Sequence, residues 1–491
     1  MARRRLGLTL PAILLFSVLV APAATGEPSV PASGQGPPQW HRCAPDQPEN
    51  FECATVRVPL DYARPGGRWI DIAISRVKAE PGTRRGVLLM NPGGPGSPGL
   101  TMPLTKQLPK EVSERYDLIG FDPRGIGAST PVTCGLGESR GWSPIQFDRA
   151  KFDEHVAQTK EIANKCWATQ SDLLPYITTR NTARDMNVIR QVLGERKISY
   201  YGVSYGTYLG AVYTQMFPRQ SDRIVLDSNV DPERTWRGMV RLWAVIAERA
   251  FDIFAGWAVE RDETYGLGTT VPEVRETFRT LLNELDRQPV TVDGQTYDGN
   301  RVRLFARGIG QHEERNIALA ELLRKLLAAE VATASAPSLP TPPMSWSPPD
   351  NRVAALLGVM CGDARWPTDV DQYLRDAIRD TQRYPMMGGQ TSNIAPCAFW
   401  PDPREPRTEI RDNRAESVLL VQSSHDTQTP VEGAMNLREL LNDNSRLALI
   451  EGSWRHGAYP GNCADDTVTR YLVHGELPSQ NVTCRSTLPY I

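Results

Sequence analysis

Six short, mainly apolar runs are spread along the chain and are separated by longer, helix-like stretches. They occupy residues 86–90, 117–121, 197–201, 223–226, 417–421 and 447–450. Runs of this length without regular polar alternation are typical of parallel strands that helices cover on both faces. In one intervening stretch, residues 182–193, Met186, Ile189 and Leu193 recur at the spacing of a helical face. The pattern therefore predicts an α/β fold with a mostly parallel central sheet.

A long insertion separates the fourth and fifth runs. Three of its segments have the spacing of amphipathic helices, namely residues 240–255, 272–285 and 317–332. A segment rich in Pro and Ser follows at residues 334–349 and is interpreted as an exposed loop, with a mobile lid segment as the alternative. The insertion is therefore expected to form a mainly helical cap.

The 491-residue chain is longer than one compact core usually needs, which favours a core domain with a second module. Upstream of the first apolar run, residues 54–58 and 69–77 alternate apolar and polar side chains around a turn-rich segment, and they predict a hairpin. We expect the core domain in two parts, residues 42–231 and 411–491. The cap, residues 232–410, is inserted between them.

The N-terminal residues 1–24 have the features of a secretory signal peptide. Arginines at positions 3–5 precede an apolar stretch at 6–20, and small residues follow at 21–23. The apolar stretch is shorter than the roughly 20 residues that span a bilayer, so a membrane anchor is the less favoured interpretation. Residues 25–41, rich in Pro, Gly and Ser, are expected to be a disordered lead-in. The mature protein is therefore expected outside the cell, without stable membrane association.

The chain has eight cysteines, and an even number in an exported protein favours disulfides. Many connectivities are possible, and the simplest one joins sequence neighbours. It pairs Cys43 with Cys53, Cys134 with Cys166, Cys361 with Cys397, and Cys463 with Cys484. There is no C-x-x-C pair and there are only six histidines, so we expect no metal site and no other cofactor.

The formal net charge is −2, and no polybasic stretch occurs. This balance gives no reason to expect a nucleic acid or an anionic membrane surface as a partner. We expect a monomer that acts on a peptide or ester substrate.

The segment with the most specific chemistry is Gly-Val-Ser-Tyr-Gly at 202–206. It directly follows the run at 197–201 and directly precedes a helix-like stretch at 207–217. G-x-S-x-G between a strand and a helix is the nucleophile elbow, a strained turn that exposes the serine. An ordinary glycine turn is the alternative. The pattern predicts Ser204 as a nucleophile and an α/β-hydrolase fold.

A serine nucleophile needs a general base, and in this fold the chain order is serine, acid, histidine. His456 lies just after the run at 447–450, where a loop can present its imidazole to the elbow. His474 lies near the end of a predicted helix and is more simply a helix-terminus residue. His425 comes too early for the base. We therefore predict His456 as the general base.

The acid is expected in the loop after the preceding strand. Asp426 follows the run at 417–421 and precedes His456, as the chain order requires. Its structural alternative is an Asx-turn or the N-cap of the next helix. We predict Asp426 as the residue that orients His456.

A glycine-rich loop, Asn-Pro-Gly-Gly-Pro-Gly at 91–96, follows the first apolar run. In this fold the loop supplies one backbone donor to the oxyanion hole, and the residue after the nucleophile supplies the other. The predicted donors are the N–H groups of Gly94 and Tyr205, with a neighbouring glycine as the alternative to Gly94.

Several motifs together resemble the secreted tripeptidyl-aminopeptidase group of actinobacteria, which belongs with the prolyl-aminopeptidase-like α/β-hydrolases. They are Pro-Gly-Gly-Pro-Gly at 92–96, Gly-Phe-Asp-Pro-Arg-Gly-Ile-Gly at 120–127, the elbow, the segment from Asp426 to Thr429-Pro430, and His456-Gly457. The resemblance covers nearly the whole mature chain and implies a triad of Ser204, Asp426 and His456 with cleavage at peptide N-termini. Many relatives have His before the glycines at the oxyanion loop, whereas Asn91-Pro92 stand here.

The sequence leads to three function hypotheses. The first is an exopeptidase that releases short peptides, with tripeptides as the length that the resemblance suggests, and binds the substrate ammonium through a cap carboxylate. Candidates for that carboxylate are Glu313, Glu314 and Asp363, although each of them taken singly is more simply interpreted as a solvated surface charge. The second is a carboxylesterase or other acyl hydrolase with the same triad. The third, least favoured, is a binding protein on a hydrolase scaffold.

Overall fold

The structure is a computed structural model that describes residues 36–136, 144–307, 309, 313–329 and 349–486. These residues belong to one of two units into which the chain divides. The other unit, Met1–Pro31, lies outside the described ranges, and so does the predicted signal peptide. Of the predicted lead-in, residues 36–41 are described.

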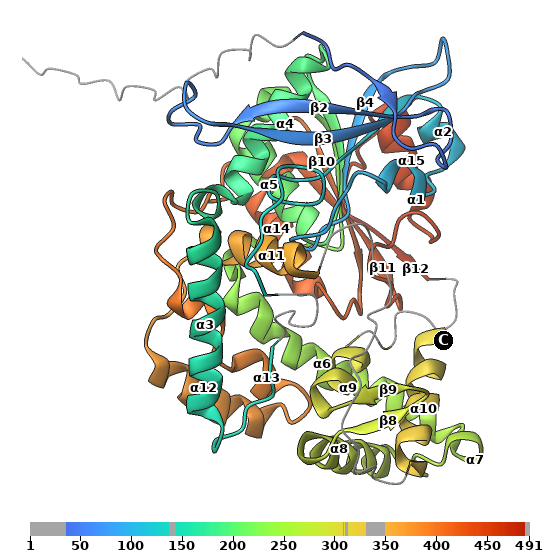
Figure 1. Ribbon diagram of the computed structural model, residues 1–491. Coiled ribbons are helices and arrows are strands. Elements are labelled where there is room, and N and C mark those ends of the chain that lie inside the picture. The colour runs from blue at the N-terminus through green and yellow to red at the C-terminus, as the bar shows by residue number, and fades with distance from the viewer. Residues whose placement is uncertain (1–35, 137–143, 308, 310–312, 330–348, 487–491) are drawn as a thin grey trace, which may run out of the picture. The chain divides into compact units, whose positions relative to one another are not determined.

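A ten-stranded sheet runs through the described core (Figure 1). From one edge to the other, the strands are β1 (His41–Arg42), β2 (Phe51–Pro59), β3 (Trp69–Val77), β5 (Tyr116–Phe121), β4 (Gly86–Asn91), β6 (Ile198–Val203), β7 (Ser221–Asp227), β10 (Val418–Ser423), β11 (Ser445–Glu451) and β12 (Val482–Arg485). Neighbours from β5 to β12 are parallel, and the pairs from β1 to β5 are antiparallel. The predicted α/β class and the mostly parallel sheet are confirmed.

Four of the six predicted runs fall within one of these strands, and the runs at 197–201 and 417–421 begin one residue before β6 and β10. The predicted hairpin is the pair β2–β3. Every residue of β4, β5, β6 and β10 is buried, which explains their continuous apolar sequence. β12 was not predicted. It is a short edge strand in which exposed and half-buried residues alternate, so it has no apolar run.

Helices cover both faces of the sheet (Figure 1). α1 (Met102–Thr105), α2 (Lys110–Ser113) and α15 (Asp465–His474) share one buried apolar cluster with the parallel strands. α4 (Thr179–Val192) packs on α5 (Tyr205–Met216), and α14 (Val431–Leu440) packs on β10 and β11. α4 begins three residues before the predicted helix because the Thr178 hydroxyl caps it by accepting the Asn181 N–H.

The insertion between β7 and β10 is mainly helical. It contains α6 (Arg237–Val259), α7 (Asp262–Tyr265), α8 (Val271–Arg287), the hairpin β8 (Val290–Val292) and β9 (Gln295–Tyr297), α9 (Gly299–Ala306), α10 (Glu313–Ala328), α11 (Pro349–Asp363), α12 (Val370–Arg383) and α13 (Gly388–Ser392). Two predicted helices lie within α6 and α8, and α10 begins and ends four residues before the third. The predicted Pro- and Ser-rich loop lies outside the described residues except for Pro349. The domain boundaries themselves stay predictions.

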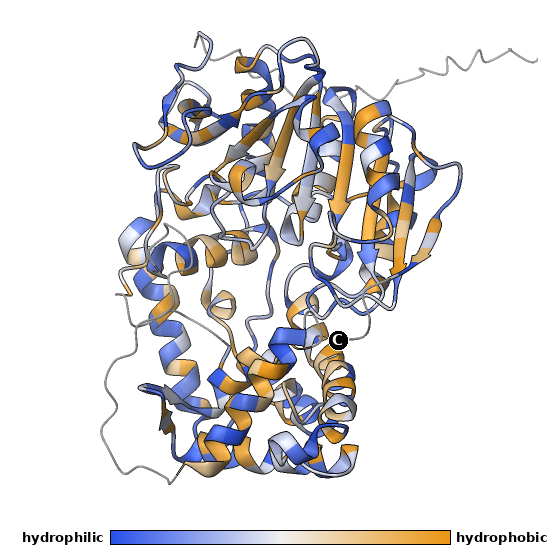
Figure 2. Cartoon of the chain, turned by 90° about the vertical axis from the view of Figure 1, so that its right-hand side faces the viewer, coloured by the Kyte–Doolittle hydropathy of each residue, from blue (hydrophilic) through white to orange (hydrophobic). Residues whose placement is uncertain are grey.

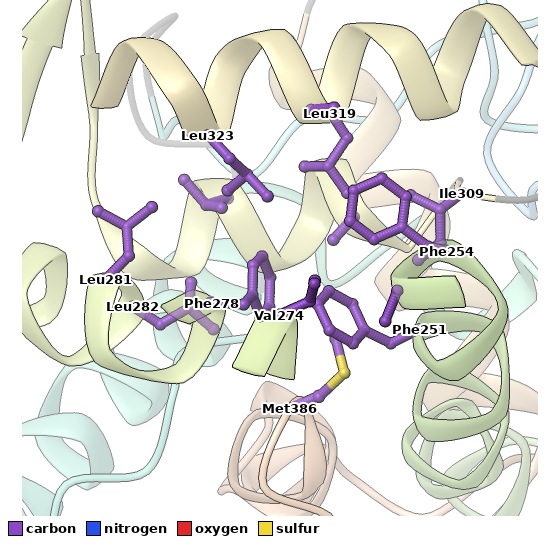
Figure 3. Close-up of a cluster of buried hydrophobic side chains, with 14 of the residues drawn as sticks. Phe251, Phe254, Val274, Phe278, Leu281, Leu282, Ile309, Leu319, Leu323 and Met386 are labelled. Carbon is purple, nitrogen blue, oxygen red and sulfur yellow. The ribbon is translucent and has the colours of Figure 1, made fainter. Parts of the chain in front are cut away.

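The cap has an apolar core of its own (Figure 3). Phe251 and Phe254 of α6 meet Phe278 and Leu282 of α8, and α10 covers them with Leu323. In Figure 2 the central strands are mainly hydrophobic, whereas the cap helices are hydrophobic on part of their surface and hydrophilic on the rest. The cap helices therefore bury one apolar stripe against each other, as amphipathic helices do.

α3 (Phe152–Gln170) packs on residues 396–399, which precede β10, and the disulfide between Cys134 and Cys166 ties α3 to the loop after β5. All four predicted pairs are present: Cys43–Cys53, Cys134–Cys166, Cys361–Cys397 and Cys463–Cys484. None of the described cysteines is left unpaired. Within the described ranges, no helix is long and apolar enough to cross a bilayer.

Candidate active site

Ser204 lies at the turn between β6 and α5 with φ 58° and ψ −123°. A non-glycine residue with positive φ is strained, and such strain is typical of a nucleophile elbow. The flanking glycines are sterically required. A Cβ at Gly202 would lie 2.5 Å from the Gly206 carbonyl oxygen, and one at Gly206 would lie 2.9 Å from the Asn91 carbonyl oxygen. The turn thus has the geometry that the motif predicts, with Ser204 partly exposed.

His456 and Asp426 are brought together by the loops after β11 and β10. His456 Nδ1 lies 2.8 Å from Asp426 Oδ2 and 3.1 Å from Oδ1. The carboxyl group is buried, whereas the His456 side chain is 19% exposed. The carboxylate favours the tautomer that carries the proton on Nδ1, which leaves Nε2 as a proton acceptor. The pair can therefore act as an oriented general base.

Asp426 is held by its own loop. Its Oδ1 accepts the N–H groups of Gln428 at 2.7 Å and Thr429 at 3.1 Å. Its Oδ2 accepts the Thr429 hydroxyl at 2.9 Å, and that hydroxyl is also 3.5 Å from His456 Nδ1. The Asx-turn considered as an alternative thus coexists with the histidine contact. The role of Thr429 could not be read from the motif that contains it, because it depends on side-chain geometry.

A buried aspartate connects the histidine loop to the elbow. The Asp227 carboxylate accepts the N–H groups of Ala458 and Tyr459, both at 2.9 Å, and the Tyr201 hydroxyl at 2.9 Å. Its carbonyl oxygen accepts the Ser204 N–H at 3.0 Å. One residue therefore fixes the backbone on both sides of the site. The sequence analysis missed Asp227, and the only signal was a carboxylate at the end of an apolar run.

The residue after Asp227 continues this support. Ser228 has φ 64°, and its hydroxyl accepts the Gly457 N–H at 2.8 Å. The three residues that follow His456 are therefore all hydrogen-bonded to the end of β7. This places the histidine loop beside the elbow.

The glycine loop after β4 lies directly against the elbow. A Cβ at Gly93 would lie 2.9 Å from Ser204 Cβ and 3.2 Å from the Tyr205 nitrogen. The Gly93 N–H is used internally, because it donates to Asn91 Oδ1 at 2.9 Å. Gly94 is the next residue, exposed and with φ 114°. Tyr205 is the first residue of α5, so its N–H has no acceptor within the helix. The glycine loop and the start of α5 thus lie beside Ser204, and the assignment of the Gly94 and Tyr205 N–H groups as oxyanion donors stays a prediction.

The Gly-Phe-Asp-Pro-Arg-Gly-Ile-Gly motif supports this loop. Asp122 Oδ1 accepts the N–H groups of Gly99 and Leu100, both at 2.9 Å, and its Oδ2 accepts that of Ala128 at 2.9 Å. Burial raises the pKa of Asp122, although these three donors oppose the rise. The motif therefore holds the backbone that follows the glycine loop.

The arginine of the same motif, Arg124, is buried and forms an ion pair with Asp185, with an N–O distance of 2.6 Å.

Two other histidines that follow the elbow in the chain, His425 and His474, have other surroundings. His425 stacks on Trp454 with ring centroids 4.7 Å apart, and its Nδ1 lies 2.7 Å from the Ser424 hydroxyl. Burial lowers the pKa of His425. His474 is exposed at the last position of α15, as predicted for a helix-terminus residue.

The three candidate carboxylates for ammonium binding differ. Asp363 is not a solvated surface charge, so that alternative is wrong for it. Its Oδ1 accepts the Thr179 N–H at 2.7 Å, and its Oδ2 accepts the Thr179 hydroxyl at 2.6 Å and Trp236 Nε1 at 3.3 Å. Burial raises its pKa to about 6. Glu313 and Glu314 begin α10, the first half-buried and the second exposed. Asp363 is therefore engaged inside the protein.

Across the described parts of the chain, no group of three or more His, Cys, Asp or Glu side chains could hold a metal ion. The chemistry available to the site from these residues is that of a nucleophilic serine and an oriented imidazole.

Comparison with known proteins adds a family context. Residues 384–484, which contain Asp426 and His456, match the family model described as TAP-like protein. The tripeptidyl aminopeptidase of Streptomyces lividans is 33% identical over 467 residues, which cover 91% of this chain and 86% of that protein. Serine protease Hip1 of Mycobacterium tuberculosis is 28% identical over 490 residues, 92% of each chain. Carboxylesterase B of the same species is 29% identical over 521 residues, 95% of each chain.

Proposed function

The chain belongs to the tripeptidyl aminopeptidase family of α/β-hydrolases, and from this premise we propose that it is a secreted serine exopeptidase that releases short peptides from free N-termini. The observation that carries the proposal is the hydrogen-bonded pair of His456 and Asp426 in loops tied to the elbow of Ser204. Four disulfides and the signal-like residues 1–24 support export.

In the proposed mechanism, Ser204 Oγ attacks the scissile carbonyl carbon while His456 Nε2 takes the hydroxyl proton. Asp426 stabilises the imidazolium that forms, and the N–H groups of Gly94 and Tyr205 donate to the oxyanion. Collapse breaks the C–N bond, and His456 returns the proton to the leaving amine. Water then hydrolyses the acyl-enzyme by the same route, which releases the N-terminal peptide and restores Ser204.

The exopeptidase part of the proposal rests on the relatives named tripeptidyl aminopeptidase. An enzyme that requires a free N-terminus must recognise the ammonium group. The test compares a tripeptidyl anilide that has a free N-terminus with its N-acetylated form. We expect cleavage of the free form and a loss of at least about tenfold in kcat/KM on acetylation, because one charged contact is worth about 1.5–3 kcal/mol. Equal cleavage of both would exclude the exopeptidase.

The length of the released peptide is measured in the same preparation. Mass spectrometry of the products from a mixed peptide substrate separates release of one, two or three residues from internal cleavage. We expect three-residue products, as the relatives' name indicates. The Ser204→Ala variant serves as the control for contaminating peptidases.

A second candidate function is a carboxylesterase. The similarity to the protein named carboxylesterase B favours it, since the coverage of both chains is as complete as for the peptidases. The triad and the acyl-enzyme would be the same. A large preference for short aryl esters over every peptide tried would support the esterase. If a fluorophosphonate fails to label the wild type, both enzymatic proposals fail and a binding protein is left.

A further inference from the structure

We propose that two cap side chains, Trp243 and Arg307, position the catalytic acid loop by holding Gln428. This inference rests on the proposed function, because it assigns a role relative to Asp426 and His456. Trp243 lies in α6, and Arg307 is the C-cap residue of α9. Gln428 lies two residues after Asp426 in the core.

Gln428 is bound to the cap through both its backbone and its side chain. Its carbonyl oxygen accepts Trp243 Nε1 at 3.0 Å. Its side-chain oxygen accepts the Arg307 guanidinium, and its side-chain amide donates to the Arg307 carbonyl oxygen at 3.3 Å. Three groups of one residue are thus occupied by the cap. We call Trp243, Arg307 and Gln428 the cap latch.

The two cap members also hold each other. The guanidinium carbon of Arg307 lies 3.6 Å from the centroid of the Trp243 ring, within the range of a cation–π contact. Arg307 Nε is buried without a hydrogen-bond partner in the described structure. Burial lowers the pKa of Arg307 to about 10, and the nearby Asp426 carboxylate opposes that change. The group is therefore charged at neutral pH and close to the triad acid.

The remaining group of Gln428, its N–H, donates to Asp426 Oδ1 at 2.7 Å. The same oxygen lies 3.1 Å from His456 Nδ1. A shift of the Gln428 backbone would therefore turn the carboxylate that orients the imidazole. Displacement of a catalytic group by about 1 Å can cost about 10²-fold in rate. The cap latch thus connects the position of the cap to the alignment of the base.

Arg249 and Glu432 offer a matched control. They form another ion pair between α6 and the core helix α14, at 3.1 Å, with side chains 67% and 58% exposed. In the described structure, the hydrogen bonds and ion pairs of Arg249 and Glu432 do not involve the cap latch. Loss of Arg249 therefore removes a cap-to-core charge contact without touching the acid loop.

The experiment measures phosphonylation of Ser204 by a small fluorophosphonate together with kcat and KM for a tripeptidyl anilide. For Arg307→Met we expect both kcat and the phosphonylation rate to fall about tenfold or more, with KM changed less than twofold. Arg307→Lys should restore part of the rate, because lysine returns the positive charge but lacks the planar guanidinium that stacks on the Trp243 ring. Arg249→Met should leave all three values within about twofold of wild type.

Two outcomes overturn the inference. A raised KM with an unchanged phosphonylation rate would mean that Arg307 contacts the substrate. Equal effects of Arg307→Met and Arg249→Met would mean that the latch is one more cap-to-core contact.

Gln428→Ala keeps the backbone N–H and removes only the side-chain half of the latch, so it tests the same idea if Arg307→Met does not fold. Its effect should not add to that of Arg307→Met in the double variant, and full additivity would contradict the latch. Failure of the wild type itself to react with the fluorophosphonate would instead reject the proposed function. The two failures are therefore distinguishable.

Discussion

The sheet core and the cap hold their functional residues in different ways. In the core, Ser204, Asp426 and His456 each lie in the first loop or turn after a parallel strand. Parallel strands bring their carboxyl ends to one edge, so residues far apart in the chain meet there. In the cap, Trp243 and Arg307 reach the same region from helices whose sequence shows only an apolar stripe. Chemistry placed by strand ends is readable from sequence, and chemistry placed by helix packing is not.

The two regions also have separate apolar cores. The core cluster joins α1, α2 and α15 to the sheet, whereas the cap cluster is built by α6, α8, α9 and α10. Trp454, in the loop that carries His456, belongs to the cap cluster. The cap is therefore packed against one of the loops that form the site, in addition to the cap latch.

The largest expected effect is the loss of kcat when Ser204, in the core, is replaced. Ser204→Ala should lower kcat by about 10⁵-fold or more, since the triad acts as a unit. Stability should stay near that of wild type. Activity is measured with the tripeptidyl anilide and folding by circular dichroism. Residual activity near the wild-type level would mean that the nucleophile is elsewhere.

The next effect tests whether the cap is an independent folding unit. Phe251→Ala should lower the free energy of unfolding by about 3–5 kcal/mol, because Phe251 is fully buried in the cap cluster. Phe305→Ala removes a ring that is 42% exposed on α9 and should change stability by less than about 0.5 kcal/mol. Urea unfolding followed by tryptophan fluorescence measures both. If the cap is an independent unit, Phe251→Ala should unfold in two transitions, the cap before the core. A single transition would mean that cap and core unfold together.

The link between the elbow and the histidine loop is tested by Asp227→Ala. It leaves the buried N–H groups of Ala458 and Tyr459 without their acceptors, so the histidine loop should shift and kcat should fall about 10²-fold. Asp222→Ala is the control at the amino end of the same strand. The Asp222 carboxylate accepts hydrogen bonds from the Ser199 hydroxyl and the Arg85 guanidinium. Asp222→Ala should cost stability but change kcat less than about threefold. Equal losses of kcat in the two variants would show that Asp227 does not hold the histidine loop in its catalytic position.

The smallest expected effect concerns the pH dependence of stability. The pKa of Asp363 is raised by burial to about 6, above the 3.8 of a free carboxyl group. A raised pKa means that the folded state binds the proton more tightly, so this contribution to stability is full below about pH 3.8 and is lost as pH rises through 6. The difference corresponds to about 3 kcal/mol at most.

Asp363→Asn tests this sign. The variant cannot ionise, so its stability relative to wild type should increase between pH 4 and pH 7, and thermal unfolding across that range measures the change. An identical pH slope in both proteins would contradict the assignment to Asp363.

Sequence patterns identified the parts of the fold in which the pattern of buried residues is regular along the chain. The six apolar runs marked the central strands because those strands are buried on both faces. β12 escaped because it lies at the sheet edge, where half of its residues need not be apolar. α11 and α12 were also not predicted. α11 is almost wholly buried, so it lacks the polar face that marks an amphipathic helix. The buried face of α12 contains two aspartates, so it shows no apolar stripe. The cysteine pairs were found because neighbours in sequence are also neighbours in space.

The elbow was where the sequence by itself determined most. Its glycines, the order of Asp426 and His456 after it, and the glycine loop specify a serine hydrolase site through residue types and chain order alone. Only the tertiary structure decided what holds that site in place. The carboxylate of Asp227 and the cap latch at Gln428 act across contacts between segments distant in the chain. A hydrogen bond of that kind depends on where two backbones meet, and local sequence does not encode that meeting.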